Sequence, residues 1–128
     1  MKSVKGVIIK GLGEGAYFMS MLHYRNEIKK KLGFDAFPGT LNVKIKENRY
    51  SLLKNLKTIK ISGYTSDNKI FGGASCYKAK IKNINGAIIL PDVNKNPENI
   101  VEFIAPVNLK SELKLKDKDK VEIYLYSK

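Results

Sequence analysis

The sequence has little of the chemistry that builds disulfides or zinc sites. It contains one cysteine, Cys76, and one histidine, His23. A single cysteine cannot form a disulfide within the chain, and one cysteine with one histidine falls short of the ligands that a structural zinc site needs. We therefore expect no zinc centre and a buried core position for Cys76.

Long apolar runs are also missing. The longest are "AIIL" and, across a proline, "FIAPV", whereas a membrane-spanning helix needs ~20 apolar residues. The first residues, "MKSVKGVIIKGLGEG", lack the apolar region and the small-residue cleavage site of a signal peptide. We therefore expect a cytoplasmic protein with no membrane partner.

Arginine is scarce in a chain that is otherwise strongly basic. The formal net charge is +12, yet only Arg25 and Arg49 of the 24 basic residues are arginine. This charge indicates a polyanionic or phosphorylated partner, or else a solvated lysine-rich surface. Because base recognition and bidentate phosphate contacts favour arginine over lysine, the composition indicates against sequence-specific DNA binding. Weak nonspecific attraction to nucleic acid stays open.

The length and the apolar content fit one domain. The chain has 128 residues, of which 43% are hydrophobic, so we expect a single domain over residues 1–128 with one core. Seven segments have the β-branched, partly alternating pattern of strands: residues 3–10, 40–46, 58–62, 74–81, 86–91, 99–106 and 120–127. Strands at this spacing, with few helices, predict a small closed barrel.

One helix is predicted between the first two strands, over residues 19–34. Met21, Tyr24, Ile28 and Leu32 recur there on one helical face, and Gly33 ends the pattern. Residues 107–117 can form a short second helix before the last strand.

A glycine-rich stretch, "GLGEGAYFMS" at residues 11–20, follows the first strand. Backbone N–H groups in such a turn can bind an anion. The spacing is not the G-x-G-x-x-G of dinucleotide-binding proteins, and the chain contains no "GK[ST]" of a Walker loop. By itself the stretch is equally consistent with a nucleotide-binding loop and with an ordinary turn from strand to helix.

A polar pair interrupts the second predicted strand, in "FPGTLNVKI" at residues 37–45. Thr40 and Asn42 are two residues apart, so on a strand their oxygens project from the same face and can reach one ion. Mg²⁺ normally takes part of its shell from carboxylates or phosphates, so two neutral oxygens suit it best when a nucleotide supplies the charge. The alternative is a pair that bonds only to the local backbone.

One carboxylate, Glu102, interrupts the apolar strand "NIVEFIAP". Strand alternation places it on the same face as Ile100 and Ile104. Either that face is partly exposed, or the carboxylate is held for a purpose. A carboxylate at a cleft can accept a hydroxyl proton during phosphoryl transfer.

Six segments occur in a characteristic order: "GLGEGAYF", "LGF", "FPGTLNVK", "NINGAIILP", "IVEFIAPVNLK" and "LKLKDKDKVEI". Together they closely resemble the archaeal CTP-dependent riboflavin kinases, over nearly the whole chain. The resemblance implies a mainly β fold, a small closed six-stranded cradle-loop (RIFT-related) barrel with one or two short helices. One of the seven predicted strands is then an excess or a short hairpin arm.

The resemblance also implies an activity and a set of site residues. The enzymes of this family transfer the γ-phosphate of CTP to the ribityl 5′-hydroxyl of riboflavin, giving FMN and CDP. The implied Mg²⁺ ligands are Thr40 and Asn42, and Glu102 is the implied catalytic residue. The implied nucleotide-binding residues are Leu12, Gly13, Glu14, Gly15, Ala16, Tyr17, Val107, Asn108, Leu109 and Lys110. Asn94 and Glu102 are implied to line the flavin side, although the family can carry Thr where this chain has Asn94.

Two other function classes remain open. The first is a nucleic-acid-binding barrel, because related cradle-loop barrels include transcription factors and the +12 charge suits DNA. The second is a flavin or nucleotide sensor without catalysis. Scarce arginine and the Thr40 and Asn42 pair argue against the first, and Glu102 argues against the second. The resemblance favours an enzyme that acts on riboflavin and CTP. We expect this enzyme to be a monomer.

Overall fold

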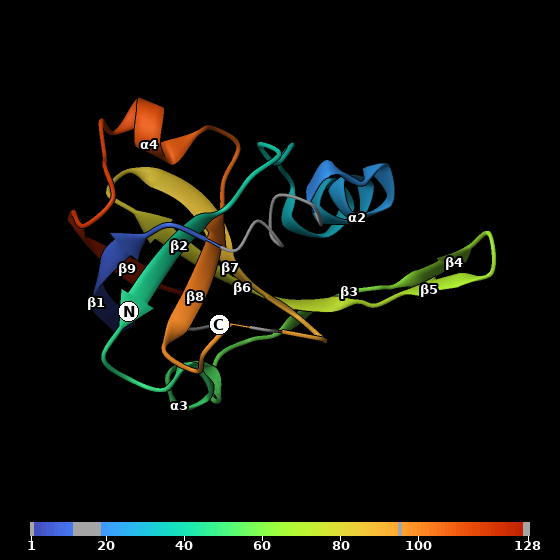
Figure 1. Ribbon diagram of the computed structural model, residues 1–128, viewed down its shortest axis with the longest axis horizontal. Coiled ribbons are helices and arrows are strands. Elements are labelled where there is room, and N and C mark those ends of the chain that lie inside the picture. Colours follow the sequence, from blue (N-terminus) through green and yellow to red (C-terminus); the bar gives the residue numbers. More distant parts are fainter. Residues whose placement is uncertain (1, 12–18, 95, 127–128) are drawn as a thin grey trace.

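The computed structural model describes residues 2–11, 19–94 and 96–126 of the chain. Within this part, six antiparallel strands close into a barrel in the order β6, β7, β8, β2, β1, β9 and back to β6 (Figure 1). These strands are β1 (Lys2–Ile9), β2 (Leu41–Ile45), β6 (Ala74–Ile81), β7 (Ile84–Pro91), β8 (Ile100–Ile104) and β9 (Lys120–Leu125). The predicted mainly β fold with a closed six-stranded barrel is confirmed.

The remaining predicted strand, β3 (Ile59–Ile61), lies outside the barrel. It pairs with the first residues of β6, from Ala74 to Cys76, whereas β9 pairs with the last residues of the same strand. β3 is therefore the one of the seven predicted strands that is not part of the six-stranded barrel.

A small hairpin of β4 (Tyr64–Ser66) and β5 (Lys69–Phe71) extends this arm away from the barrel (Figure 1). Asp67 and Asn68 connect its strands with positive φ values of 50° and 63°, the conformation that suits a two-residue hairpin turn. Neither of these strands was predicted, because strands of three residues are too short to show alternation.

Two apolar cores lie on the two sides of the sheet. The first fills the barrel and includes Ile8, Val43, Phe103 and Ile123. The second lies on the outer face of β6, β7 and β8, where the predicted helix α2 (Leu22–Leu32) covers it. The sequence predicted one core, because it does not reveal that both faces of these strands are covered.

Cys76 lies in the second core and is fully buried, as predicted. Burial raises the pKa of its thiol to about 12, so the thiol is neutral at physiological pH.

Two short helices complete the described structure. α4 (Leu109–Glu112) is the predicted second helix. α3 (Arg49–Leu53) was not predicted; Asn48 begins it, because its side chain accepts hydrogen bonds from the backbone N–H groups of Tyr50 and Ser51. No helix in the described ranges is long and apolar enough to cross a membrane.

Candidate functional site

A polar cluster lies where β2 and β8 pair. Its strand side chains point away from the barrel interior, yet other segments cover them and they are buried. Asn42 of β2 is directly opposite Glu102 of β8, and Thr40 precedes β2. Asn42 is 6% exposed and Glu102 is 3% exposed. Burial of polar groups costs free energy unless they are hydrogen-bonded, so the contacts of these side chains need to be accounted for.

Glu102 accepts a hydrogen bond at each carboxylate oxygen. Thr40 Oγ1 donates to Oε1 over 3.0 Å, and Asn96 Nδ2 donates to Oε2 over 3.3 Å. The alternative of an exposed Glu102 is therefore wrong. The neighbouring β7 residue, Ile89, is itself buried, and the loop that follows β7 supplies the Asn96 donor.

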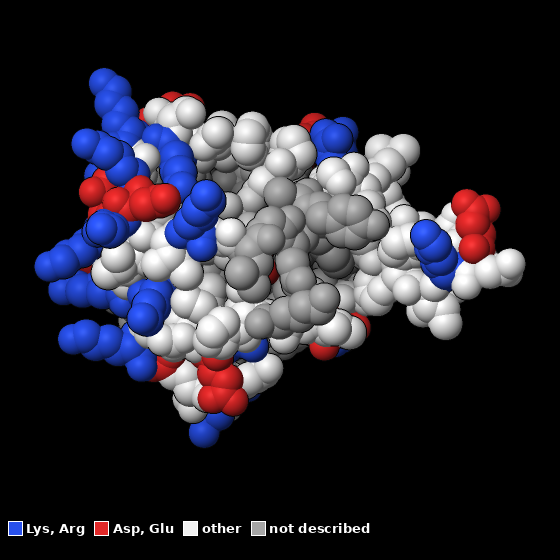
Figure 2. All heavy atoms as spheres, viewed as in Figure 1, with Lys and Arg blue, Asp and Glu red and all other residues white. Residues whose placement is uncertain are grey.

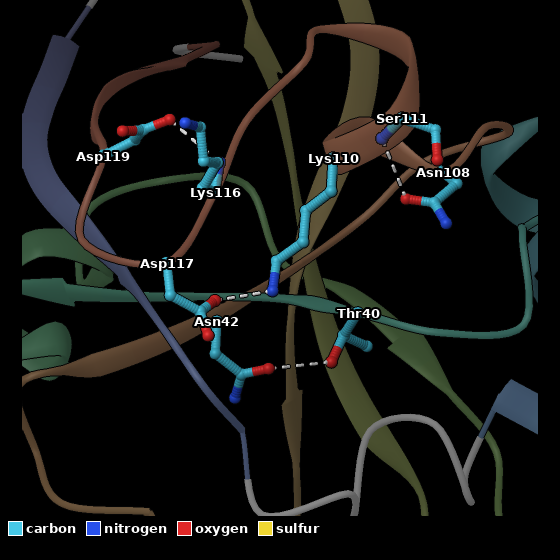
Figure 3. A network of polar contacts seen from close by, with 8 residues as sticks. All are labelled: Thr40, Asn42, Asn108, Lys110, Ser111, Lys116, Asp117 and Asp119. Carbon is cyan, nitrogen blue, oxygen red and sulfur yellow. Dashed lines mark hydrogen bonds and ion pairs between the residues drawn. The ribbon is translucent and has the colours of Figure 1, made fainter.

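Thr40 and Asn42 lie together as their spacing predicts. Thr40 Oγ1 is 3.3 Å from Asn42 Oδ1 (Figure 3). The hydroxyl has one proton and faces two acceptors, Asn42 Oδ1 and Glu102 Oε1. The cluster is thus rich in oxygen acceptors, an arrangement that suits a hard cation or a hydroxyl donor. The assignment of Thr40 and Asn42 as Mg²⁺ ligands stays a prediction.

Gly11, the first residue of the glycine-rich stretch, lies directly against this cluster. A Cβ atom at Gly11 would lie 2.4 Å from Asn42 Oδ1, which is closer than real atoms approach. A side chain at position 11 would therefore have to displace the buried Asn42 amide, whereas glycine lets the backbone pass beside it. The predicted nucleotide-binding residues of the stretch, Leu12, Gly13, Glu14, Gly15, Ala16 and Tyr17, lie outside the described residues.

A pocket of about 180 Å³ opens beside Thr40. Its lining brings Thr40 together with all four residues of the second predicted nucleotide segment: Val107, Asn108, Leu109 and Lys110. Segments far apart in the sequence therefore meet at one concave surface. Their role in nucleotide binding stays a prediction.

Two polar contacts shape the α4 side of this pocket. Asn108 Oδ1 accepts a hydrogen bond from the backbone N–H of Ser111 over 3.3 Å and so caps α4. Lys110 Nζ forms an ion pair with Asp117 over 2.7 Å (Figure 3). Both side chains of the pair are about half exposed, so an incoming phosphate can compete with Asp117 for the ammonium group.

The loop after β7 contains one site residue that the sequence indicated and one that it did not. Asn94 Oδ1 accepts from the backbone N–H of Asn96 over 2.9 Å, so Asn94 orders the loop. The side chain that contacts Glu102 is that of Asn96. The sequence "NKN" at residues 94–96 could have indicated Asn96. An asparagine side chain often accepts a hydrogen bond from the backbone N–H two residues later, and this turn orients the residue at that position.

A larger groove of about 610 Å³ lies elsewhere on the barrel surface. Its charged lining consists of Lys5, Lys44, Lys46, Lys82, Lys120 and Glu122. Hydrogen bonds from Ser3 and Tyr124 lower the pKa of Glu122. Figure 2 shows basic side chains gathered at the end of the molecule opposite the β4–β5 arm. We place the candidate site at the smaller pocket, because the buried, hydrogen-bonded carboxylate lies beside that pocket and not in the larger groove.

The comparison with protein families agrees with the order of the sequence motifs. The family model CTP-dep_RFKase, described as "Domain of unknown function DUF120", matches residues 8–125. This range contains every described residue of the buried cluster and of the pocket.

Curated relatives give the same result. The riboflavin kinase of Methanocella arvoryzae is 43% identical over 122 residues, which cover 95% of this chain and 56% of that protein. The riboflavin kinase of Pyrobaculum aerophilum is 44% identical over 123 residues, covering 92% of this chain and 58% of that protein. That of Ignicoccus hospitalis is 39% identical over 127 residues, covering 97% and 71%. The chain thus spans little more than half the length of the first two relatives.

Proposed function

The chain belongs to the CTP-dep_RFKase family, and on that premise we propose that it is a riboflavin kinase. It transfers the γ-phosphate of CTP to the ribityl 5′-hydroxyl of riboflavin, and the products are FMN and CDP. The observation that carries the proposal is the buried Glu102 carboxylate, held by Thr40 beside a pocket that the 107–110 segment lines.

Glu102 acts on the proton of the riboflavin hydroxyl. Its carboxylate accepts this proton as the hydroxyl oxygen bonds to the γ-phosphorus, while the bond from that phosphorus to the bridging oxygen of CTP breaks and CDP leaves. Phosphoryl transfer depends mainly on positioning and on charge stabilisation. The protein must therefore hold the carboxylate of the base in a fixed orientation toward the riboflavin hydroxyl. The donors on both carboxylate oxygens of Glu102 supply that orientation.

The oxygen-rich cluster fits Mg²⁺, and Thr40 and Asn42 are the residues that would hold it. Their oxygens are 3.3 Å apart and are neutral. Bound Mg²⁺ supplies positive charge that offsets the negative charge of the phosphoryl oxygens. Because the two ligands carry no formal charge, the protein alone holds the ion weakly, and nucleotide phosphates complete the site.

The nucleotide binds between the glycine-rich stretch and the start of α4. Support for this position comes from the pocket that joins Thr40 to Val107, Asn108, Leu109 and Lys110. The Lys110 ammonium at the rim attracts phosphate oxygens. We propose CTP as the donor because the family is named for it.

The flavin approaches from the side of Glu102 that faces the loop after β7. Asn94 and Asn96 belong to this loop: the Asn96 side chain donates to Glu102, and Asn94 accepts from the backbone N–H of Asn96. We further propose that residues 1–128 form one domain, that this domain acts as a monomer, and that its small-molecule partners are riboflavin, FMN, CTP and CDP.

One incubation tests the proposal. The protein is mixed with riboflavin, Mg²⁺ and each of CTP, ATP, GTP and UTP in turn, and FMN is measured by chromatography. We expect FMN with CTP and much less with the other nucleotides. Folded protein that makes no FMN with any nucleotide contradicts the enzyme proposal, and preference for ATP contradicts the donor assignment alone.

A further inference from the structure

Arg49, the first residue of α3, has a guanidinium group in an unusual environment. The residue is 2% exposed, and buried cations are normally paired with an anion. No carboxylate in the described parts of the chain forms an ion pair with it. Its hydrogen-bond partners are backbone carbonyl oxygens and one tyrosine hydroxyl.

Those carbonyls all belong to one short segment, residues 96–100. Nη1 donates to the carbonyl oxygens of Asn96, Pro97 and Ile100, and Nη2 donates again to that of Asn96. The distances to Asn96 are 3.4 Å from both nitrogens. A single buried side chain therefore fixes the path of the loop that leads into β8.

Neighbouring groups fasten the same loop. The backbone N–H of Arg49 donates to the carbonyl oxygen of Glu98 over 2.8 Å, and Asn48 Nδ2 donates to Glu98 Oε2 over 2.6 Å. The start of α3 thus contacts the loop through its backbone, through its cap and through the guanidinium.

Asn96 connects this loop to the carboxylate of the candidate site. The carbonyl oxygen of Asn96 receives two of the Arg49 hydrogen bonds, and its side-chain amide donates to Glu102 Oε2 over 3.3 Å. Arg49 and Glu102 are thus linked through one residue.

We propose that Arg49 is a positioning residue for Glu102. By holding the Asn96 backbone, the guanidinium directs the Asn96 amide onto Oε2 and so fixes the carboxylate that receives the riboflavin proton; this proposal rests on the proposed function. Arginine suits this role because its planar group presents several donors in fixed directions, whereas lysine presents one ammonium.

The chain offers a matched pair of variants. Arg49→Lys keeps the charge and removes the fork of donors, and Arg25→Lys makes the same change at the other arginine, on α2. We expect Arg49→Lys to lower kcat by about 10- to 100-fold, because a small displacement of a catalytic group is enough to cause such a loss. KM for CTP stays near the wild-type value, and Arg25→Lys leaves both constants unchanged.

A double-mutant cycle separates positioning from general support of the fold. Asn96→Ala removes the amide that contacts Glu102. If Arg49 acts through Asn96, the double variant has the kcat of Asn96→Ala alone, because the two changes interrupt one connection. Losses in kcat that multiply overturn the proposal.

A measurement without substrate distinguishes failure of the positioning role of Arg49 from failure of the proposed function. Hydrogen exchange of the backbone amide of Ile100, which bonds to the Pro97 carbonyl, is measured in wild type and in both arginine variants. We expect faster exchange in Arg49→Lys only. Wild-type protein that makes no FMN refutes the proposed function, whereas an active wild type with unchanged exchange and kcat in Arg49→Lys refutes the positioning role.

A milder variant covers the case in which Arg49→Lys does not fold. Asn48→Ser keeps a side chain that can cap α3, but the shorter side chain does not reach Glu98. We expect faster loop exchange and a few-fold lower kcat with an unchanged KM for CTP. Wild-type exchange and wild-type kcat in Asn48→Ser overturn the proposal.

Discussion

Asn42 and Lys44 are two residues apart on the same outward face of β2, yet they lie in different surroundings. Asn42 is buried in the cluster with Thr40 and Glu102, while Lys44 is exposed in the large lysine-lined groove. Strand alternation treats the two positions alike. What separates them is the segments that cover the cluster: Gly11 lies against Asn42, and Asn96 of the loop after β7 contacts Glu102, whereas the Lys44 side chain is exposed.

This difference indicates which polar residues can be replaced without loss of stability or activity. In the cluster each oxygen has a partner at 3.0 to 3.3 Å, so removing a group leaves another one buried and unsatisfied. In the groove the ammonium groups are exposed and solvated, and solvated charges contribute little to stability. We therefore expect substitutions in the cluster to be costly and substitutions in the groove to be tolerated.

The largest effect is expected for Glu102→Gln, which keeps the shape of the side chain but cannot accept a proton. A general base contributes on the order of 10²- to 10⁴-fold, so kcat should fall by that factor while CDP affinity changes little. Steady-state kinetics and CDP titration provide the measurements. A raised KM for riboflavin with kcat retained would reduce Glu102 to a flavin ligand, and an unchanged kcat/KM would remove both roles.

Thr40→Val comes next, because it replaces the hydroxyl that donates within the cluster by a methyl group of similar size. We expect turnover to fall at least about 10- to 100-fold, the range found when a group that only supports a metal site is lost, because Thr40 is itself a proposed ligand. Calorimetric titration of Mg²⁺ with and without CDP should show appreciable binding only with CDP, and weaker binding in the variant. Tight Mg²⁺ binding to wild type without nucleotide contradicts the proposed ligand set.

Gly11→Ala tests the covering of the cluster with the smallest possible side chain. The added Cβ would collide with Asn42 Oδ1, so we expect a loss of stability of about 1–3 kcal/mol and lower turnover. Gly72→Ala is the control, because a Cβ at Gly72 meets nothing within 4 Å. Thermal melts of both variants provide the measurement; equal melting temperatures would mean that the Gly11 backbone does not pass over Asn42.

The smallest effect is expected in the groove. In the double variant of Lys44→Glu and Lys120→Glu we expect kcat to stay within about twofold of wild type, because both side chains are exposed and lie outside the candidate site, and exposed substitutions of this kind rarely destabilise the fold. The variant should lose retention on a heparin column more than a variant with Lys30→Glu and Lys69→Glu does. A large fall in kcat would show that the groove takes part in the reaction.

The fold was largely predictable because its signals are local. Alternation identified the barrel strands, and the i and i+2 spacing of Thr40 and Asn42 brought their oxygens together. The burial of Glu102 was not predictable, since it depends on a loop that Arg49 holds from 47 residues away. Asn96 was missed for the same reason, because its role appears only when the loop folds back onto β8.

Transfer of labelled phosphate tests the central claim most directly. The γ-phosphate of CTP is radiolabelled, and label in FMN is measured for wild type, for Glu102→Gln and for the double groove variant. We predict label in FMN at similar rates for wild type and the groove variant, and on the order of 10²- to 10⁴-fold slower for Glu102→Gln. Folded wild type that transfers no label, or Glu102→Gln that transfers it at the wild-type rate, would contradict the assignment of the reaction to the buried cluster.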